Sequence, residues 1–230
     1  MGRDVDAHLV PVADRFVRAF LEVDAIGLGL GAGGFYFWKQ RPAAQDEKQA
    51  NGRPTTATVE FRDYRDVSGA FDHIVSIEMI EAVGYEFLDT YFGKCAALLR
   101  DGGLACIQAI TIDDRFHDEA LHSVDFIQRY IFPGGALPSV NRMLEVISDE
   151  TDMNLHHMED FGLHYARTLK LWHSNFKRAH TPLQQLGYDN YFMRLWEFYL
   201  CYCEGGFIER SIGTAQLLLT KPAAHGVPLL

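Results

Sequence analysis

The chain has 230 residues, of which 48% are apolar, and its formal net charge is −10. This length favours one large domain with a sizeable core over two smaller domains. The acidic balance and the lack of a basic stripe argue against a general nucleic-acid-binding protein, because a phosphate backbone attracts clustered Lys and Arg.

The cysteines and the N-terminus bear on the cellular compartment. The four cysteines include no CxxC pair and no Cys/His ligand spacing, so we expect reduced thiols and no structural zinc. The N-terminus is too polar for a signal peptide. The longest apolar run, residues 26–38, is shorter than the roughly 20 residues that a membrane-spanning helix needs. We therefore expect a cytoplasmic protein.

The first 58 residues contain three segments of different character. Apolar residues at helical intervals predict a helix over residues 6–23. A glycine-rich run, IGLGLGAGGFYFW, follows at residues 26–38. Residues 40–58 are polar and contain Pro and Gly, which indicates a loop, a weak helix or a linker.

A strand–helix–strand unit is predicted in the middle of the chain, after a short strand at residues 59–61. Residues 73–77 (HIVSI) are almost continuously apolar, as in a strand buried on both faces. Residues 85–100 have helical spacing and lead into Asp101-Gly102-Gly103, a helix stop and tight turn. Residues 104–110 (LACIQAI) form a second buried strand. This order predicts a βαβ unit.

The C-terminal part predicts an antiparallel pair of strands. Residues 190–208 form a long aromatic-rich helix, residues 211–220 (SIGTAQLLLT) a strand, and residues 153–161 its candidate partner at the sheet edge. An α/β domain with a mostly parallel sheet follows. We divide the chain into an N-terminal segment, a main domain and a tail: residues 1–58, 59–222 and 223–230.

Five blocks occur in an order that resembles a known family: FDHIVSIEMIEAVG (71–84), LLRDGGLACIQAITI (98–112), DFIQRYIFPGGALPS (125–139), FGLHYARTLKLWHSNF (161–176) and WEFYLCYCEGGF (196–207). Together they resemble the cyclopropane-fatty-acyl-phospholipid synthase family, which includes mycolic acid cyclopropane synthases, of S-adenosylmethionine (SAM)-dependent methyltransferases. The resemblance implies a doubly wound, Rossmann-like class I methyltransferase sheet with an antiparallel C-terminal strand and a helical insertion. Ligands of such sheets bind beyond the carboxyl ends of the strands.

The resemblance also implies a reaction. The cis double bond of an unsaturated fatty acyl phospholipid takes the methyl group of SAM, and the resulting carbocation loses a proton to bound bicarbonate as a cyclopropane ring closes. Aromatic faces stabilise the cation, and a dry pocket keeps water from trapping it. A lipid substrate implies peripheral contact with a membrane, and a homo-oligomer is left open.

Four residues match the family's bicarbonate site: Glu81, Gln108, Ile110 and Tyr165. Gln108 stands where many members have histidine, and it cannot act as a base at neutral pH. Cys203 matches a cysteine proposed for the active site. From the residues alone, Glu81 also fits an exposed glutamate at a helix start, and the other side chains also fit core or pocket-lining roles.

The segment expected to bind SAM matches the family pattern only weakly. Gly29, Gly31, Gly33 and Gly34 lie where a glycine-rich cofactor turn would be, but the segment that follows is about one βα unit too short. An apolar packing segment is the alternative. By resemblance, three further residues border SAM and a fourth is a candidate cofactor contact: Tyr64, Arg65, Ile77 and Glu78.

The aromatic stretch at residues 125–132 is predicted to be a helix, ended by Pro133-Gly134-Gly135. The resemblance implies that this insertion covers the site, with Phe126, Tyr130 and Phe132 lining the acyl-chain channel. The alternative is that these rings only pack the insertion onto the sheet.

The sequence is also compatible with two other functions. One is a related methyltransferase with another acceptor, and the other is a noncatalytic lipid-binding remnant, truncated or completed by another chain. A histidine cluster (His156, His157, His164 and His173) fits no closed zinc pattern, so no metal is expected.

Overall fold

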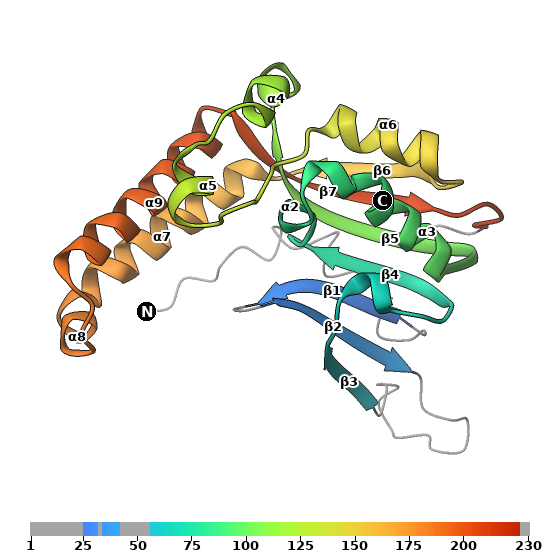
Figure 1. The fold of residues 1–230 in the computed structure, drawn as a ribbon, viewed down its shortest axis with the longest axis horizontal. Helices are drawn as coiled ribbons and strands as arrows, with labels where there is room; N and C mark the ends of the chain where they lie inside the picture. The colour runs from blue at the N-terminus through green and yellow to red at the C-terminus, as the bar shows by residue number, and fades with distance from the viewer. Residues whose placement is uncertain (1–24, 32–33, 42–55, 226–230) are drawn as a thin grey trace, which may run out of the picture.

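The computed structural model of the chain describes residues 25–31, 34–41 and 56–225. They form one seven-stranded sheet with the order β3-β2-β1-β4-β5-β7-β6 and helices packed on it (Figure 1). The strands are β1 (Ala25–Gly31), β2 (Gly34–Arg41), β3 (Thr56–Phe61), β4 (Phe71–Ile77), β5 (Leu99–Ile112), β6 (Asn154–Asp160) and β7 (Ile212–Thr220). The helix predicted over residues 6–23 lies outside the described residues.

The described helices follow the strands in an α/β order. They are α2 (Ile80–Val83), α3 (Leu88–Leu98), α4 (Asp114–Leu121), α5 (Phe126–Tyr130), α6 (Val140–Glu150), α7 (Gly162–Arg178), α8 (His180–Gln185) and α9 (Asn190–Ile208), with short 3-10 turns at Tyr64–Asp66 and Tyr85–Phe87. Helices α7 and α9 lie side by side and extend away from the sheet, with α8 at their far end (Figure 1).

The predicted βαβ unit is confirmed. Strands β4 and β5 pair in parallel, with Ile74 opposite Ala105, and α3 connects them. The helix ends at Leu98, earlier than predicted, and β5 begins at once. The glycine turn therefore lies inside β5, where the register with β4 shifts. Gly102 has a φ of 74°, a left-handed conformation that glycine adopts without a Cβ clash.

The predicted C-terminal strand pair is also confirmed. Strand β7 runs antiparallel to both β5 and β6, and β6 forms the edge of the sheet. Helix α9 covers the predicted range. It packs mainly against α7 and touches β7, while Phe198 and Tyr202 contact the Phe126 ring.

The glycine-rich run forms a β-hairpin in place of a strand–turn–helix. Strand β1 pairs in parallel with β4, whereas β2 is antiparallel to both β1 and β3. Only two residues separate Gly31 from its pairing partner Gly34, and so short a connection joins antiparallel strands only. Strands β2 and β7 thus oppose the common direction of the other five. The sheet is mixed and not mostly parallel as predicted, because of the six neighbouring pairs of described strands only β1–β4 and β4–β5 are parallel.

Both ends of the polar segment predicted over residues 40–58 lie in the sheet. Strand β2 extends to Arg41, and β3 begins at Thr56. Aromatic residues in GFYFWKQR favour an extended strand. The boundary placed at residue 58 lies inside β3, so the sheet does not divide there.

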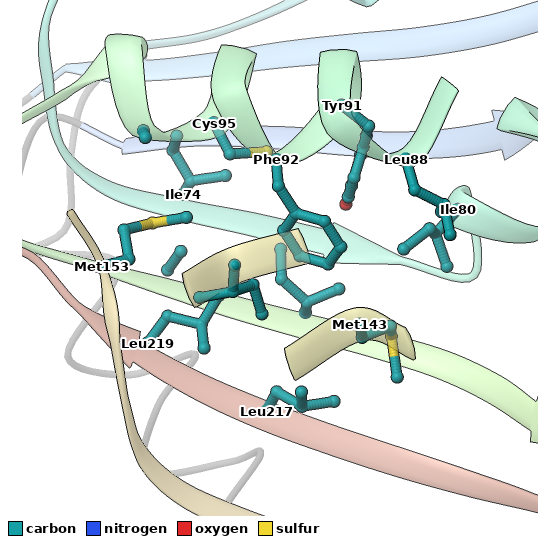
Figure 2. Packing of buried hydrophobic residues seen from close by; sticks show 14 of the residues in the cluster. Ile74, Ile80, Leu88, Tyr91, Phe92, Cys95, Met143, Met153, Leu217 and Leu219 are labelled. Atoms are coloured by element: carbon teal, nitrogen blue, oxygen red, sulfur yellow. The ribbon is translucent and has the colours of Figure 1, made fainter. Parts of the chain in front are cut away.

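The main core lies between the sheet and helices α3 and α6 (Figure 2). Phe92 and Leu217 are fully buried in it, and the rings of Tyr91 and Phe92 meet edge to face at 5.1 Å. A second cluster joins α7 and α9 to Ile110. Ala109 belongs to the main core, so successive residues of β5 face opposite sides of the sheet.

Two glycines should respond oppositely to alanine. A Cβ on Gly103 would lie 2.8 Å from the Arg100 carbonyl oxygen and 3.0 Å from that of Asp72, and backbone atoms cannot easily move. We expect Gly103→Ala to lower the free energy of unfolding by about 1–3 kcal/mol. Gly93 lies in α3 with open space around it, so Gly93→Ala should raise that energy by about 0.5–1 kcal/mol. Urea unfolding checks both, and equal effects would contradict this packing.

Candidate active site

The candidate site lies where β4 and β5 end at the same edge of the sheet. Glu78 follows β4 directly, and Glu81 lies in the first turn of α2. On β5, Gln108 pairs with Ile77, and Ile110 follows two residues later. Parallel strands bring their carboxyl ends to one edge, which is where ligands of such sheets bind.

Glu78 is the centre of a hydrogen-bond network. Its Oε1 accepts hydrogen bonds from Gln108 Nε2 at 2.8 Å and from the Tyr165 hydroxyl, which comes from α7, at 2.5 Å. Its backbone N–H donates to the Gln108 carbonyl at 2.9 Å. Gln108 Oε1 accepts from Gln216 Nε2 on β7 at 2.8 Å. The network thus links β4, β5, β7 and α7.

Sequence reasoning missed Gln216 and the central place of Glu78. Gln216 is a polar residue within the apolar strand sequence AQLLL, and this was the available signal. A buried strand rarely carries an amide without a partner, so such a residue indicates a network.

Glu81 has an unusual environment for a carboxyl group. Its Oε1 accepts a hydrogen bond from the Ile110 backbone N–H at 2.5 Å. Its Oε2 is buried and has no partner among the described residues. Burial, opposed by the backbone hydrogen bond from Ile110 and aided by the nearby charge of Glu78, raises the pKa of Glu81 to about 7. Glu81 can therefore be a neutral acid close to neutral pH.

Tyr165 and Cys203 lie in the same cluster between α7 and α9. The Tyr165 ring centroid is 5.1 Å from that of Phe207. Burial and the hydrogen bond to Glu78 raise the pKa of Tyr165, so its hydroxyl remains a donor. Burial raises the pKa of Cys203 to about 12, which leaves a neutral thiol and favours a pocket-lining role over a nucleophilic one.

The residues expected to hold bicarbonate come together, but their donors are already engaged. Gln108 and Tyr165 both donate to Glu78, and the Ile110 N–H donates to Glu81. The Tyr165 hydroxyl and the Ile110 N–H have one proton each to donate. A bicarbonate ion does not fit this donor set as it stands, because Glu78 occupies the acceptor position.

The helix predicted over residues 125–132 is shorter in the structure: α5 covers only Phe126–Tyr130 and packs on α9 (Figure 1). Asp125 caps α5, and the chain after it is tied to α2 by a hydrogen bond from the Ala136 N–H to the Glu81 carbonyl at 2.8 Å. The Phe126 ring meets Phe198 of α9 edge to face, with centroids 4.6 Å apart. Phe132 packs 6.4 Å from Tyr199, which also touches the Tyr165 cluster.

The outer rings of this insertion remain accessible. The side chains of Tyr130 and Phe132 are 50% and 58% exposed. The insertion thus places aromatic residues next to the carboxylate network without burying them in the main core. A hollow of about 530 Å³ lies elsewhere, between α8 and α9 beside Met193, and does not coincide with this site.

The cofactor-side residues divide into two groups. Gly29 of β1 pairs with Ile77 of β4, which is 48% exposed, and Gly31 ends β1 at the same edge. These residues fit a ligand at the edge, since glycine backbone permits close approach. Gly33 lies outside the described residues.

The other group follows β3, which ends at the same edge because Phe61 pairs with Tyr36 and Tyr36 with Gly29. The Tyr64 side chain is buried in the main core, with its ring 5.9 Å from Tyr91. The Arg65 guanidinium pairs with Asp63 at 2.7 Å. Strand β2 ends at the opposite edge from β1 because the two are antiparallel, so the carboxylate on this side comes from Asp63, after β3.

The four histidines His156, His157, His164 and His173 do not come together as a group of ligands. Where side chains are described, no group of three His, Cys, Asp or Glu residues could hold a metal ion. His173 instead lies 3.0 Å from Glu197 through its Nε2. Among the described residues, no helix combines the length and apolar character needed to cross a membrane.

Comparison with known proteins places this geometry in a family. The family model described as mycolic acid cyclopropane synthetase matches residues 17–217. The tuberculostearic acid methyltransferase UfaA1 of Mycobacterium tuberculosis is 40% identical over 183 residues, covering 80% of this chain and 43% of that protein. The cyclopropane-fatty-acyl-phospholipid synthase of Escherichia coli is 32% identical over 187 residues, covering 80% and 47%. The chain spans about half the length of these relatives.

Solved structures agree. The mycolic acid cyclopropane synthase CmaA1, complexed with SAH and CTAB, has a TM-score of 0.61 and 26% identity, covering 69% of this chain and 58% of that chain. The cyclopropane synthase MmaA2 from Mycobacterium tuberculosis matches the fold with a TM-score of 0.62, 24% identity and the same coverage. This chain therefore belongs to the mycolic acid cyclopropane synthetase family, whose members are SAM-dependent methyl and cyclopropane transferases that act on lipids.

Proposed function

We propose that this chain carries the site of SAM-dependent methyl transfer to the cis double bond of an unsaturated fatty acyl phospholipid, giving a cyclopropane ring. The observation that carries the proposal is the network at the ends of β4 and β5. There, Glu78, Glu81 and Tyr165 meet beside the edge where β1 pairs with β4. A methyl-branched product is the second candidate, favoured by the 40% identity to a tuberculostearic acid methyltransferase.

The two sides of the site have separate tasks. When bound, SAM supplies an electrophilic methyl group. Gly29, Gly31 and Ile77 are the residues that would hold it, at the end of β1 and at the end of β4. The acceptor side comes from residues 59–222. The division concerns only where the two ligands would bind, because the described strands all belong to one sheet.

The chain's own residues support chemistry at a cationic carbon. The aromatic layer of α5 and α9 offers ring faces to an acyl chain, with Phe126 and Phe132 nearest the packed helices. Such faces stabilise a cation by about 0.5–2 kcal/mol each. The raised pKa of Glu81, about 7, favours its neutral form and so lowers the negative charge of the network. Peripheral contact with a membrane follows from a lipid substrate.

A binding and transfer experiment tests this function. We expect the 230-residue chain to bind SAM, and to move the labelled methyl group of SAM into vesicles of an unsaturated phospholipid but not into vesicles of its saturated counterpart. Mass spectrometry of the released fatty acids would separate a cyclopropane from a methyl branch. A dissociation constant for SAM weaker than about 1 mM, together with no transfer, would support a noncatalytic lipid-binding role instead.

A further inference from the structure

We propose that the carboxylate of Glu78, and not a bound bicarbonate ion, accepts the proton that the acyl intermediate releases. This inference rests on the proposed function, because it assigns one step of the same reaction. It gives Glu78 a catalytic role, with Gln108 and Tyr165 as the residues that position it.

Glu78 already occupies the position where a bound anion would lie. Both side-chain donors that converge at the site, Gln108 Nε2 and the Tyr165 hydroxyl, point to the same oxygen, Glu78 Oε1, at 2.8 and 2.5 Å. A free anion would have to displace a carboxylate that is already attached to the protein. The tethered group has the advantage, because it loses no translational freedom when it binds.

The backbone of Glu78 has an unusual conformation. Its φ is 50°, a left-handed conformation that glutamate seldom adopts and that costs on the order of 1–3 kcal/mol. The hydrogen bond from its N–H to the Gln108 carbonyl, at 2.9 Å, helps to hold this conformation. A strained residue is retained where its side chain must sit at one place, and here that place is between Gln108 and Tyr165.

Among the polar side chains of the site, Glu78 is the one best placed to take a proton. Gln108 is an amide and cannot act as a base, and the raised pKa of Tyr165 keeps it protonated. Burial raises the pKa of Glu81 to about 7, so about half of it is neutral near pH 7; its Oε1 accepts from Ile110, and its Oε2 is buried. Glu78 is half-buried, and among the described residues its Oε2 accepts no hydrogen bond. Oε2 is therefore free to receive a proton.

The proposed reaction joins the methyl carbon to the alkene and removes one proton from it. The alkene π electrons form a bond to the methyl carbon, the electron pair of the sulfur–methyl bond stays on sulfur, and the neighbouring alkene carbon becomes cationic. Glu78 Oε2 then removes a proton from the transferred methyl group. The electron pair of that C–H bond closes the three-membered ring, and the Glu78 carboxylic acid returns its proton to solvent. No oxidant or reductant is needed.

Turnover with and without bicarbonate separates the two bases. In buffer depleted of carbon dioxide, we expect the natural chain to keep its turnover and Glu78→Gln to lose about 100-fold or more. Glu78→Gly should lose as much, but added bicarbonate or formate should restore at least about 10-fold in a saturable way, because Gln108 and Tyr165 become free donors. The control is Glu86→Gln, an exposed glutamate outside the site, which should match the natural chain.

A second readout does not depend on activity. Titration with carbon-13-labelled bicarbonate, followed by NMR, should detect binding to Glu78→Gly and none to the natural chain at the same millimolar concentrations. Glu78→Gly should fold at least as stably, because glycine adopts a positive φ at little cost. Thermal melting checks that its lost turnover is not a loss of structure.

The outcomes keep the two proposals apart. Natural-chain turnover that vanishes without bicarbonate, or full turnover by Glu78→Gln, would overturn the role of Glu78 and leave the methyl transfer standing. If no protein transfers a methyl group, the proposed function fails. In that case, bicarbonate binding to the natural chain as strong as to Glu78→Gly would also overturn the occupancy of the anion position by Glu78.

Discussion

The stability of a Glu81→Gln variant relative to the natural chain should rise by about 3 kcal/mol between pH 4.5 and pH 8. Burial raises the pKa of Glu81 from its ordinary value of 4.5 to about 7 in the folded protein. The folded state therefore holds the proton more tightly than the unfolded state does. The stabilisation from the protonated form is fully present below the unfolded pKa and is lost as pH rises through about 7.

Glutamine lacks this titration but keeps an oxygen that accepts from the Ile110 N–H, a hydrogen bond of 2.5 Å in the natural chain. Urea unfolding at several pH values measures the difference, and Glu86→Gln is the control for the same change in formal charge. Any constant offset, such as an amide proton left without a partner, does not alter the slope. Parallel stability curves for Glu81→Gln and the natural chain would contradict the buried environment.

The same variant should lose turnover if Glu81 takes part in the reaction. Its buried Oε2 has no partner among the described residues, which is the kind of unsatisfied group that a functional site retains at a cost in stability. A more stable protein with less activity is thus the expected pattern. Full turnover by Glu81→Gln would remove Glu81 from the mechanism.

Replacing Phe92 with alanine should lower the free energy of unfolding by about 3–5 kcal/mol. Phe92 is fully buried on α3 and lies with its ring between the sheet and α6 (Figure 2). Its ring also meets Tyr91 edge to face at 5.1 Å. Alanine would leave a cavity in a core that cannot collapse without moving α3 against α6.

The matched control is Phe87→Ala, just before α3, where the side chain is 48% exposed. It should cost about 1 kcal/mol or less, because little apolar area leaves contact with the protein. Urea or thermal unfolding of both variants gives the comparison. Equal losses at the two positions would show that Phe92 does not lie in the core between α3 and α6.

Local pattern identified most of the elements around the site. Apolar runs marked β4 and β5, helical spacing marked α3 and α9, and the last two strands were found with nearly their observed ends. These elements are predictable because side chains alternate with a fixed period, which the sequence carries directly. The hairpin of β1 and β2 was missed because glycine permits several backbone paths, and pairing with β4 selects one of them.

The sequence by itself determined the family and its candidate residues, because five ordered blocks carry Glu81, Gln108 and Tyr165 on recognisable elements. Only the tertiary structure decided which atoms meet. Tyr165 bonds to a residue 87 positions away, and Gln216 to one 108 positions away. No local period encodes such distances. The place of Glu78 at the centre of the network follows from how β4, β5, β7 and α7 pack, and from the left-handed backbone that this packing holds.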